Sequence, residues 1–524
     1  MNKRSNWIVF AVIAVCLAIT YSYTLDTKLD INGDNATYIT LARNIAAGHG
    51  YAEQTVDGYN HTGNFPPGYS FILSLFISLG IDNLVFFKIL NAVFLLVSLY
   101  LLYAVFAAVT RQRWLSSAAA LLVCFSPQLL HFAGMAMSEM SYMFFMVLSV
   151  FCLWRYSEQG EGQAFWRSPW FWIAIVAAMC CYHIRSVGIA LVISVVLFFV
   201  FRKEWLASAA SAAGMVLLAL PWTLRNHHYG IESRYMGTVM TVNPWRPEQG
   251  TISSVGEFVD KMITNLDQTV IQGFPRVLFP FAGEESNTPS GTLGVILGLV
   301  VLAVVVFGAW KTGRLRWLML FLLAGNIGLF AIWHGGNGTR YVTPIIPLVY
   351  FFFYNGLFSL VQLSLKGRLK ADSAIAAVIL VMMLPGIGPL KEAHQISAMP
   401  YSPAYRNYFH MARELDRKLP AGTLVCCRKP ELFKYYAPHL LTCPFQPEVD
   451  NAKFISILAD FKVEYVVVDQ LGYASTARCL VPAVQSRMDL FPAVWKLDNP
   501  DTWLLYFRRD AYLEEQANDN QQQQ

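Results

Sequence analysis

The chain has 524 residues, of which 55% are hydrophobic and only 14% are charged, and its mean hydropathy is +0.42. Soluble proteins of this size have about 25% charged residues, so the composition excludes an ordinary soluble domain and predicts a membrane protein. The net charge of +5 does not indicate a nucleic-acid partner, because the basic residues stand in small clusters at the ends of apolar runs, where membrane orientation explains them.

Apolar runs of membrane-spanning length follow one another along the first 390 residues. A spanning helix needs about 20 apolar residues, or roughly 17 when its ends snorkel. Eleven runs reach or approach this length: 7–23, 84–109, 114–130, 140–154, 169–182, 187–201, 205–222, 291–310, 317–333, 344–365 and 374–390. The fourth to sixth runs are short, which leaves the count open by one or two.

The connections between the runs predict the orientation. With a cytoplasmic N-terminus every inner connection carries Lys or Arg, as the positive-inside bias requires, and the C-terminus lies outside. The basic residues of these connections are Lys3, Arg4, Arg111, Arg113, Arg155, Arg167, Arg202, Lys203, Lys311, Arg314, Arg316, Lys366, Arg368 and Lys370. The first run could be a signal peptide, but no clear small-x-small cleavage motif follows it, so we expect a retained anchor.

Three segments lie outside on this topology: a first outer loop at 24–68, a loop at 223–290, and the chain from residue 391 onward. We therefore divide the chain into a transmembrane module at 1–390, an outer domain at 391–515 and a disordered tail at 516–524. In the outer domain an amphipathic helix at 404–419 precedes short β-rich runs at 423–427, 465–468 and 503–507, with helical stretches between them. This alternation predicts a small α/β domain.

Nine cysteines divide between these parts. Five lie in apolar runs and are interpreted as small apolar residues. The other four, Cys426, Cys427, Cys443 and Cys479, lie in the outer domain, where an oxidising compartment would permit a disulfide. Their spacing does not choose the partners, so the existence of a bridge stays open.

The first outer loop contains a short amphipathic helix. Asp34 stands where an N-cap is expected, and Gly48 and Gly50 supply a stop. One face of the helix is formed by Tyr38, Leu41, Ala42 and Ile45. Asp34 is either a plain cap or a carboxylate at the membrane border that serves chemistry on a lipid phosphate.

Further charged residues stand at the outer ends of other runs. Glu139 begins the fourth run, where it could also be an ordinary helix-start acid. Arg185 occupies a very short outer turn, Arg225 closes the seventh run, and Arg340 opens the tenth. Each arginine could be a snorkelling anchor, but their gathering on the face that the positive-inside bias depletes favours anion binding.

The order of these motifs resembles a known family. The motifs are GDNATYITLARNIAAGHGY at 33–51, NFPPGYSF at 64–71, MSEM at 137–140, HIRSVG at 183–188, LPWTLRN at 220–226 and TRYVTPIIP at 339–347. Together they resemble the GT-C glycosyltransferases of the family 39 type that use polyprenyl-phosphate sugars, in particular bacterial relatives of protein O-mannosyltransferases and of the lipid A aminoarabinose transferase. The resemblance covers nearly the whole chain and implies a multi-pass α-helical membrane protein with about 11 transmembrane helices and a C-terminal periplasmic α/β domain.

The resemblance also implies a reaction. A sugar is transferred, with inversion, from an undecaprenyl-phosphate carrier to a glycan, lipid A or protein acceptor at the periplasmic face of the bacterial inner membrane. The acids of the family match Asp34 and Glu139, and its late arginine matches Arg340. The family often has a second acid after the first, whereas here Asn35 follows Asp34, which gives more weight to Glu139.

These roles suit the residue types. Asp34 is our candidate base for the acceptor hydroxyl, and Arg340, with Arg185 or Arg225, would stabilise the phosphate that leaves. The residues that we expect to support them are Tyr38, Arg43, His49, His61, Asn226 and Tyr341.

The sequence leaves a divalent metal open. All ten histidines, including His334, fall on the predicted outer side, and some family members bind a divalent cation near the first loop, so His49 and His61 are the possible ligands. No His-x-x-x-His pair occurs, and no nucleotide-binding fingerprint is found.

Two other classes of protein remain as alternatives. A flippase or transporter usually carries ionisable residues near the bilayer midplane within repeated halves, whereas here the candidate acids stand at the outer border and we find no repeat. A non-catalytic envelope protein with an external binding domain is the third hypothesis.

Overall fold

The structure is a computed structural model, which describes residues 3–159, 164–233, 235–242, 250–281, 288–333, 338–365 and 371–522. The basic residues Lys366, Arg368 and Lys370 and the histidine His334 lie outside these ranges. The chain forms two compact units. The first consists of Met1–Thr27, Gly63–Ile72 and Ile81–Ala398, and the second of Lys28–Thr62, Leu73–Gly80 and Met399–Gln524.

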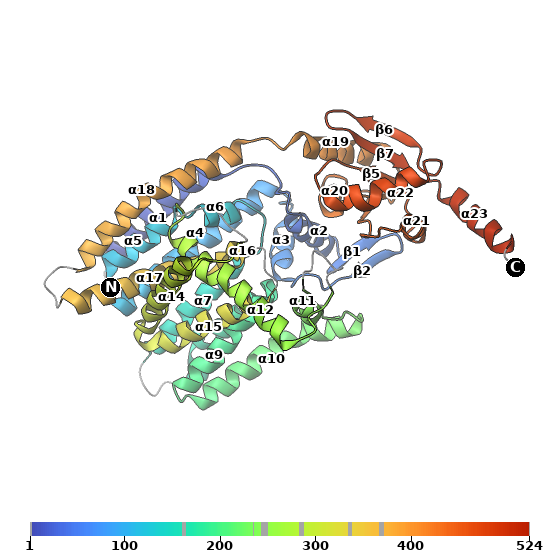
Figure 1. Cartoon of the computed structure of the whole chain (residues 1–524). Coiled ribbons are helices and arrows are strands. Elements are labelled where there is room, and N and C mark those ends of the chain that lie inside the picture. The colour runs from blue at the N-terminus through green and yellow to red at the C-terminus, as the bar shows by residue number, and fades with distance from the viewer. Residues whose placement is uncertain are drawn as a thin grey trace. The chain divides into compact units, whose positions relative to one another are not determined.

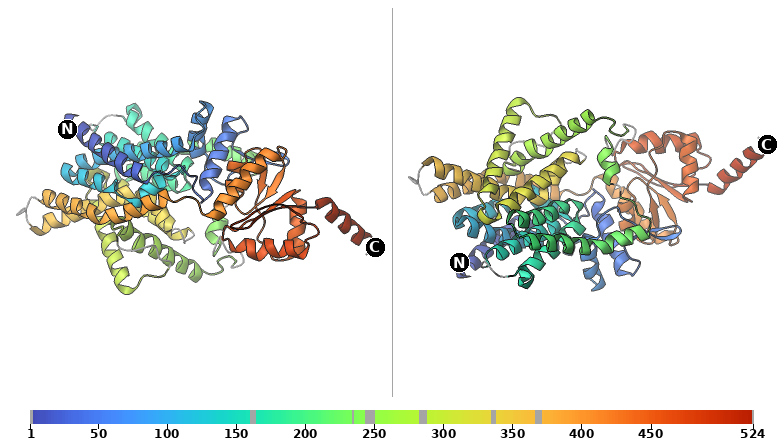
Figure 2. Two further views of the ribbon diagram at one scale, coloured as in Figure 1. Left: turned by 90° about the horizontal axis from the view of Figure 1, so that it is seen from above. Right: turned by 90° about the horizontal axis from the view of Figure 1, so that it is seen from below.

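The first unit is a helical bundle, whose elements are labelled in Figure 1 and seen from two other sides in Figure 2. All eleven predicted apolar runs are helical. The helices that contain them are α1 (Lys3–Thr24), α4 (Leu84–Thr110), α5 (Arg113–Val123) with α6 (Pro127–Ala133), α7 (Glu139–Ser157), α8 (Pro169–Ile184), α9 (Ile189–Phe201), α10 (Trp205–His228), α14 (Thr292–Trp310), α15 (Arg316–Ile332), α17 (Ile346–Leu365) and α18 (Ala371–Ala398).

Eight helices of the described chain are long and apolar enough to cross a membrane, and a ninth span is possible if α5 and α6, bent by 61°, count as one. Two predicted runs, those of α8 and α9, form shorter apolar helices. The chain is therefore a multi-pass helical membrane protein, while the predicted total of 11 spans stays a prediction.

Shorter helices connect the spans. They are α3 (Gly68–Ser78), which belongs to both units, α11 (Tyr235–Met240), α12 (Val255–Leu266), a π-helical turn (Asp267–Gln272), α13 (Gly273–Leu278), α16 (Gly338–Val342) and 3-10 turns at Phe165–Arg167, Ser186–Gly188, Gly313–Leu315 and Thr343–Ile345. The spans pack closely where residues are small: a Cβ on Gly308 of α14 would collide with the Phe352 carbonyl of α17, and one on Gly356 with the Val304 carbonyl.

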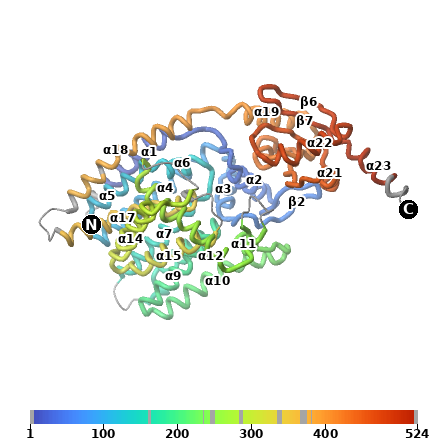
Figure 3. Tube along the Cα trace, viewed as in Figure 1, coloured from blue at the N-terminus to red at the C-terminus, as the bar shows by residue number. Residues whose placement is uncertain are grey.

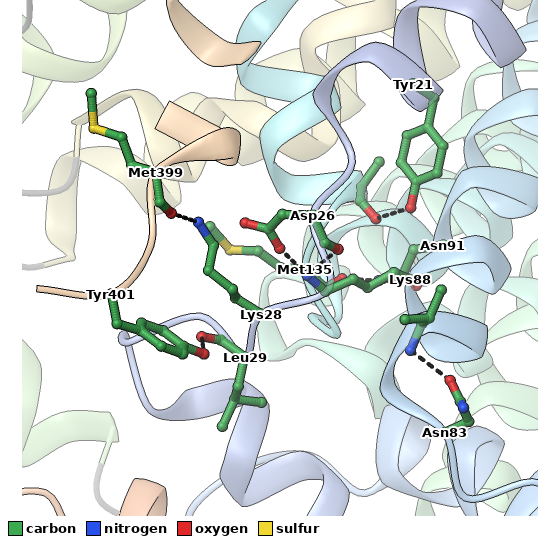
Figure 4. A network of polar contacts seen from close by, with 12 residues as sticks. Tyr21, Asp26, Lys28, Leu29, Asn83, Lys88, Asn91, Met135, Met399 and Tyr401 are labelled. Atoms are coloured by element: carbon green, nitrogen blue, oxygen red, sulfur yellow. Dashed lines mark hydrogen bonds and ion pairs between the residues drawn. The ribbon is translucent and has the colours of Figure 1, made fainter. Parts of the chain in front are cut away.

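A buried polar network ties α4 to its neighbours (Figure 4). The Lys88 side chain, only 1% exposed, lies 2.6 Å from Asp26 Oδ1 in an ion pair. One turn further along, the Asn91 amide donates to the carbonyls of Met135 (2.6 Å) and Met137 (3.0 Å). Because these carbonyls stand just before α7, the network fixes the segment that leads to Glu139.

The second unit contains a five-stranded sheet of order β4-β3-β5-β7-β6. Its strands are β3 (Leu424–Cys426), β4 (Leu441–Cys443), β5 (Tyr465–Val468), β6 (Ala493–Leu497) and β7 (Thr502–Tyr506). β3 is parallel to both β4 and β5, whereas β7 is antiparallel to β5 and β6. The helices are α19 (Pro403–Lys418), α20 (Pro430–Tyr436), α21 (Asn451–Asp460), a π-helical turn (Thr476–Leu480), α22 (Val481–Ser486) and α23 (Arg509–Gln522). The predicted C-terminal α/β domain is therefore present.

Residues 28–62 of the first outer loop belong to the second unit, and Figure 3 shows the trace of the chain. It contains α2 (Asp34–Ala46) and a hairpin of β1 (Ala52–Thr55) and β2 (Gly58–His61). Lys434 Nζ of α20 donates to Gln54 Oε1 of β1 at 2.9 Å, and the Arg43 guanidinium of α2 lies 5.0 Å from the centre of the Tyr435 ring.

The structure bears on the predicted tail and on the disulfide that the sequence left open. Residues 516–522 of the tail continue helix α23, although their polar composition predicted disorder; residues 523 and 524 are outside the described ranges. All nine cysteines are described and free, and no disulfide joins Cys426, Cys427, Cys443 or Cys479.

One buried carboxylate stands out at the sheet. Asp469 directly follows β5 and is 3% exposed. Its Oδ1 accepts from the Leu471 amide at 3.0 Å, but its Oδ2 has no hydrogen-bond partner among the described residues. Burial raises the pKa of Asp469 to about 6, and the positive charge of Arg428 opposes this only in part.

Asp469→Asn should therefore stabilise the protein at neutral pH. The folded state holds the Asp469 proton more tightly than the unfolded chain, where the pKa is 3.8, so the carboxyl favours folding below about pH 4 and this contribution is lost as the pH rises through about 6. The shift corresponds to about 3 kcal/mol. We expect the unfolding midpoints of the two proteins, measured in detergent, to coincide near pH 4 and to differ by several degrees at pH 8; a difference independent of pH would contradict this.

Candidate active site

Glu139 is the first residue of α7 and its side chain is completely buried. An acid in the first turn is favoured by the helix dipole, but a fully buried carboxylate needs cationic partners to offset its lost hydration. The segment before it is held by Asn91, so the position of Glu139 is set by the chain as well as by its own contacts.

Two arginines supply this compensation. Arg185 Nη1 lies 2.8 Å from Glu139 Oε1 and also donates to Ser138 Oγ at 3.0 Å, and Arg340 Nε lies 3.5 Å from the same carboxylate oxygen. Arg185 comes from the turn after α8, and Arg340 from α16. Three segments far apart in sequence therefore meet at one carboxylate, and the structure brings together the candidate residues Glu139, Arg185 and Arg340.

In this Glu139–arginine cluster, two guanidinium groups face one carboxylate. The Arg185 and Arg340 side chains are 18% and 22% exposed, so each keeps a solvent-facing part. Glu139 Oε2 has no hydrogen-bond partner among the residues that the structure describes. The exposed parts of the two arginines can therefore bind a phosphate.

Arg225 and Asn226 close α10, as predicted. Arg225 Nη1 donates to Asn226 Oδ1 at 2.8 Å, and the guanidinium lies over the rings of Trp222 (4.6 Å) and Tyr229 (5.4 Å). These contacts lie along its own helix and give Arg225 an aromatic cradle. Tyr341 follows Arg340 in α16 and is half-buried.

The start of α2 differs from the prediction in one respect. Gly33, with φ of 104°, is the N-cap, and Asp34 is the first helical residue, where its carboxylate still benefits from the helix dipole. The positive φ explains why glycine occupies the cap position. Of the predicted apolar face, Tyr38, Leu41 and Ala42 are buried and Ile45 is half-buried.

A second carboxylate lies beside Asp34 in the second unit, and sequence reasoning missed it. Glu431, in the first turn of α20, packs against Gly33 so closely that a Cβ there would collide with Glu431 Oε1. Burial raises the pKa of the Glu431 carboxyl, and the negative charge of Asp34 raises it further. Lys429 Nζ lies 3.6 Å from Glu431 Oε1 and donates to the Asn32 carbonyl at 3.0 Å. Nothing in the sequence linked α20 to this loop.

The two histidines named as possible metal ligands lie in the same loop. His49 stacks on Tyr59, with ring centres 3.9 Å apart, and His61 ends β2. Within the described part of the chain, no group of three His, Cys, Asp or Glu side chains could hold a metal ion.

Comparisons with known proteins agree with this fold. Residues 6–233 match the family described as dolichyl-phosphate-mannose-protein mannosyltransferase. No curated protein matches the sequence significantly.

Solved structures are similar over almost the whole chain. The oligosaccharyltransferase of Archaeoglobus fulgidus, tethered to an acceptor peptide, has a TM-score of 0.58 at 14% identity, covering 96% of this chain and 74% of its own. ArnT from Cupriavidus metallidurans, bound to undecaprenyl phosphate, has a TM-score of 0.55 at 12% identity, covering 95% and 98%. The mycobacterial arabinofuranosyltransferase AftD has a TM-score of 0.52 at 13% identity, covering 95% and 40%.

The chain therefore has the GT-C glycosyltransferase fold, which confirms the resemblance seen in its motifs. The catalytic and binding roles of Asp34, Glu139 and the arginines remain predictions.

Glu139→Gln should strongly destabilise the protein, because it leaves two partly buried guanidinium groups without their carboxylate. Breaking a buried pair of this kind costs about 3 kcal/mol or more. Thermal unfolding of the purified chain in detergent should show a clearly lower midpoint.

A matched control is Glu414→Gln, which removes the carboxylate that pairs with the exposed Arg417 and Lys418 on α19. Exposed pairs contribute little, so the midpoint should hardly move. Equal, small shifts for the two variants would show that the buried cluster does not hold the bundle together.

Proposed function

We propose that the protein transfers a sugar from an undecaprenyl-phosphate-linked donor to a hydroxyl of a glycan, lipid A or protein acceptor at the periplasmic face of the bacterial inner membrane. The fold supports the class of enzyme, and a protein of similar fold, ArnT, has been captured with undecaprenyl phosphate. Identity this low carries the fold alone, so the donor, acceptor and chemistry are argued from the residues of this chain.

The Glu139–arginine cluster is the observation that carries the proposal. A polyprenyl-phosphate donor presents an anionic phosphate at the edge of the bilayer, where charges are poorly hydrated. Arg185 and Arg340, held by one buried carboxylate, offer preorganised cationic donors there. Buried charges at the ends of apolar helices are expensive, which favours a functional explanation over a structural one.

The proposed reaction is a direct displacement. Asp34 accepts the proton of the acceptor hydroxyl as its oxygen attacks the anomeric carbon from the side opposite the phosphate. The bond from that carbon to the phosphate oxygen breaks, its electron pair stays on the departing polyprenyl phosphate, and Arg340 and Arg185 stabilise the added charge. One bond forms as another breaks at the same carbon, so the configuration inverts.

Glu139 has a supporting part in this scheme. Its Oε1 contacts both arginines and would orient them toward the phosphate. A carboxylate committed to two guanidinium groups is a poor proton acceptor, which is why we assign the base to Asp34.

A flippase would move the same sugar-linked lipid across the membrane without breaking its bond to the sugar. The two activities differ in their product, because a transferase releases undecaprenyl phosphate and consumes the sugar-linked lipid, whereas a flippase conserves it. Vesicles that contain the purified chain and mass-tagged undecaprenyl-phosphate pentoses or hexoses distinguish them by mass spectrometry.

Asp34→Asn should lower the transfer rate by about a hundredfold to ten thousandfold, the usual contribution of a general base. The control is Asp57→Asn, in the same loop, whose carboxylate is 81% exposed and pairs only loosely with Lys462 at 3.3 Å. Release of undecaprenyl phosphate in the vesicle assay measures both. An Asp34→Asn protein as active as the control would reduce Asp34 to a helix-start acid.

Arg340→Ala should chiefly raise the KM for the lipid donor, by roughly tenfold to a hundredfold, because one charged hydrogen bond to phosphate is lost. Arg202→Ala is the matched control, since Arg202 pairs with Glu204 at 2.7 Å at the other end of α9. Initial rates over a range of donor concentrations provide the comparison. An unchanged KM in Arg340→Ala would remove Arg340 from the phosphate site.

A further inference from the structure

The C-terminal sheet has a topological switch point. β3 lies at the centre of the three parallel strands; the chain passes from it through α20 to β4 on one side, and returns through α21 to β5 on the other. Beyond β5 the chain continues away from β3, to β6 and β7. The connections that leave β3 and β5 thus diverge, and in open α/β sheets ligands bind in the crevice at the carboxyl ends of such strands.

Polar side chains gather at this edge. Arg428 follows β3 by two residues, and Asp469 follows β5 directly. Two side-chain atoms here, Asp469 Oδ2 and Arg428 Nε, are buried and have no hydrogen-bond partner among the described residues. The same holds for Ser475 Oγ and Thr476 Oγ1, in the segment that follows Tyr473. Asp469 and Thr476 are only 3% and 6% exposed. Buried polar atoms normally have a hydrogen-bond partner, so the unpartnered atoms of Asp469 and Arg428 indicate a ligand at this edge.

Aromatic rings line the same edge. The Arg428 guanidinium lies 4.4 Å from the centre of the Tyr473 ring, and Lys429 Nζ lies 5.4 Å from it. The Tyr473 hydroxyl is 3.3 Å from that of Tyr405 in α19. An aromatic ring beside hydrogen-bond donors and acceptors is typical of a site that binds a small ligand specifically.

The buried carboxylate at this edge lowers the stability of the folded protein at neutral pH. Asp469 is ionised at neutral pH although it is almost completely buried, and this lowers the stability of the fold, as argued above. Destabilising arrangements of this kind are typical of functional sites.

We propose that this switch-point site, formed by Arg428, Asp469, Tyr473, Ser475 and Thr476, binds a sugar of the acceptor. A neutral polyhydroxylated ring supplies hydroxyl donors for Asp469 Oδ2 and acceptors for Arg428, and its apolar face can stack on Tyr473. That the sugar belongs to the acceptor rests on the proposed function, whereas the binding of a sugar at this site does not.

An anionic ligand fits less well. Asp469 would repel it, and Pro430 at the start of α20 removes one backbone donor where a phosphate would otherwise be held. Glu431 adds a carboxyl next to it, and Lys429 is already engaged with Glu431 and the Asn32 carbonyl.

The same contacts connect the site to Asp34. Lys429, which adjoins Arg428, holds the carbonyl of Asn32, two residues before Asp34, and Glu431 packs on Gly33. A sugar bound at the sheet edge would thus lie within the unit that carries the proposed base. This gives the C-terminal domain a part in choosing the acceptor.

Saturation-transfer NMR tests the binding with the full chain in detergent micelles and no donor lipid. The probes are galactose, glucose, mannose and N-acetylglucosamine, with inorganic phosphate as a competitor. We expect at least one sugar to bind the wild-type protein, and Asp469→Asn and Arg428→Met each to weaken it at least tenfold, as the loss of one charged hydrogen bond predicts.

The control is Asp489→Asn, on the exposed surface of the same domain, where Asp489 pairs with Arg487 at 2.8 Å; it should bind like the wild type. Asp469→Asn is expected to be at least as stable as the wild type, so lost binding would not reflect unfolding. The proposal is overturned if no sugar binds, if both site variants bind normally, or if phosphate displaces the sugar. Binding without any transfer activity would instead refute the proposed function and leave this site standing.

Discussion

One buried carboxylate organises the membrane-embedded unit. Glu139 cannot be stable without cations, and the two that reach it, Arg185 and Arg340, come from connections far away in the sequence. The requirement to neutralise one charge therefore fixes how three helix ends meet. It also holds together the two guanidinium groups that we propose bind the phosphate of the donor, so the same interaction supports both the fold and the proposed chemistry.

Much of this could be predicted from the sequence because the signals are local. The length of each apolar run predicts a helix. The helical spacing of the apolar residues in the first outer loop predicts which face of that helix is buried, and Tyr38 and Leu41 are indeed buried. Glu139 and Arg340 could be expected to meet because both stand at the same ends of their runs. The order of the motifs along the chain, which resembles that of the GT-C glycosyltransferases, predicted the fold of the whole chain.

Other features could not be predicted because they depend on which elements become neighbours. Gly33 and Asp34 are both acceptable N-cap residues, and only backbone geometry separates them. Glu431 and Asp469 follow short segments in the C-terminal domain without any periodic pattern, and their surroundings depend on the order of strands in the sheet. The association of the first outer loop with that domain is a non-local packing choice of the same kind.

The most direct test is an experimental structure of the full chain in a lipid nanodisc with undecaprenyl phosphate. We predict the phosphate oxygens within hydrogen-bond distance of Arg340 and Arg185, with Glu139 still bridging the two guanidinium groups. A phosphate bound elsewhere, with both arginines turned away from it, would contradict the assignment of this cluster to the donor.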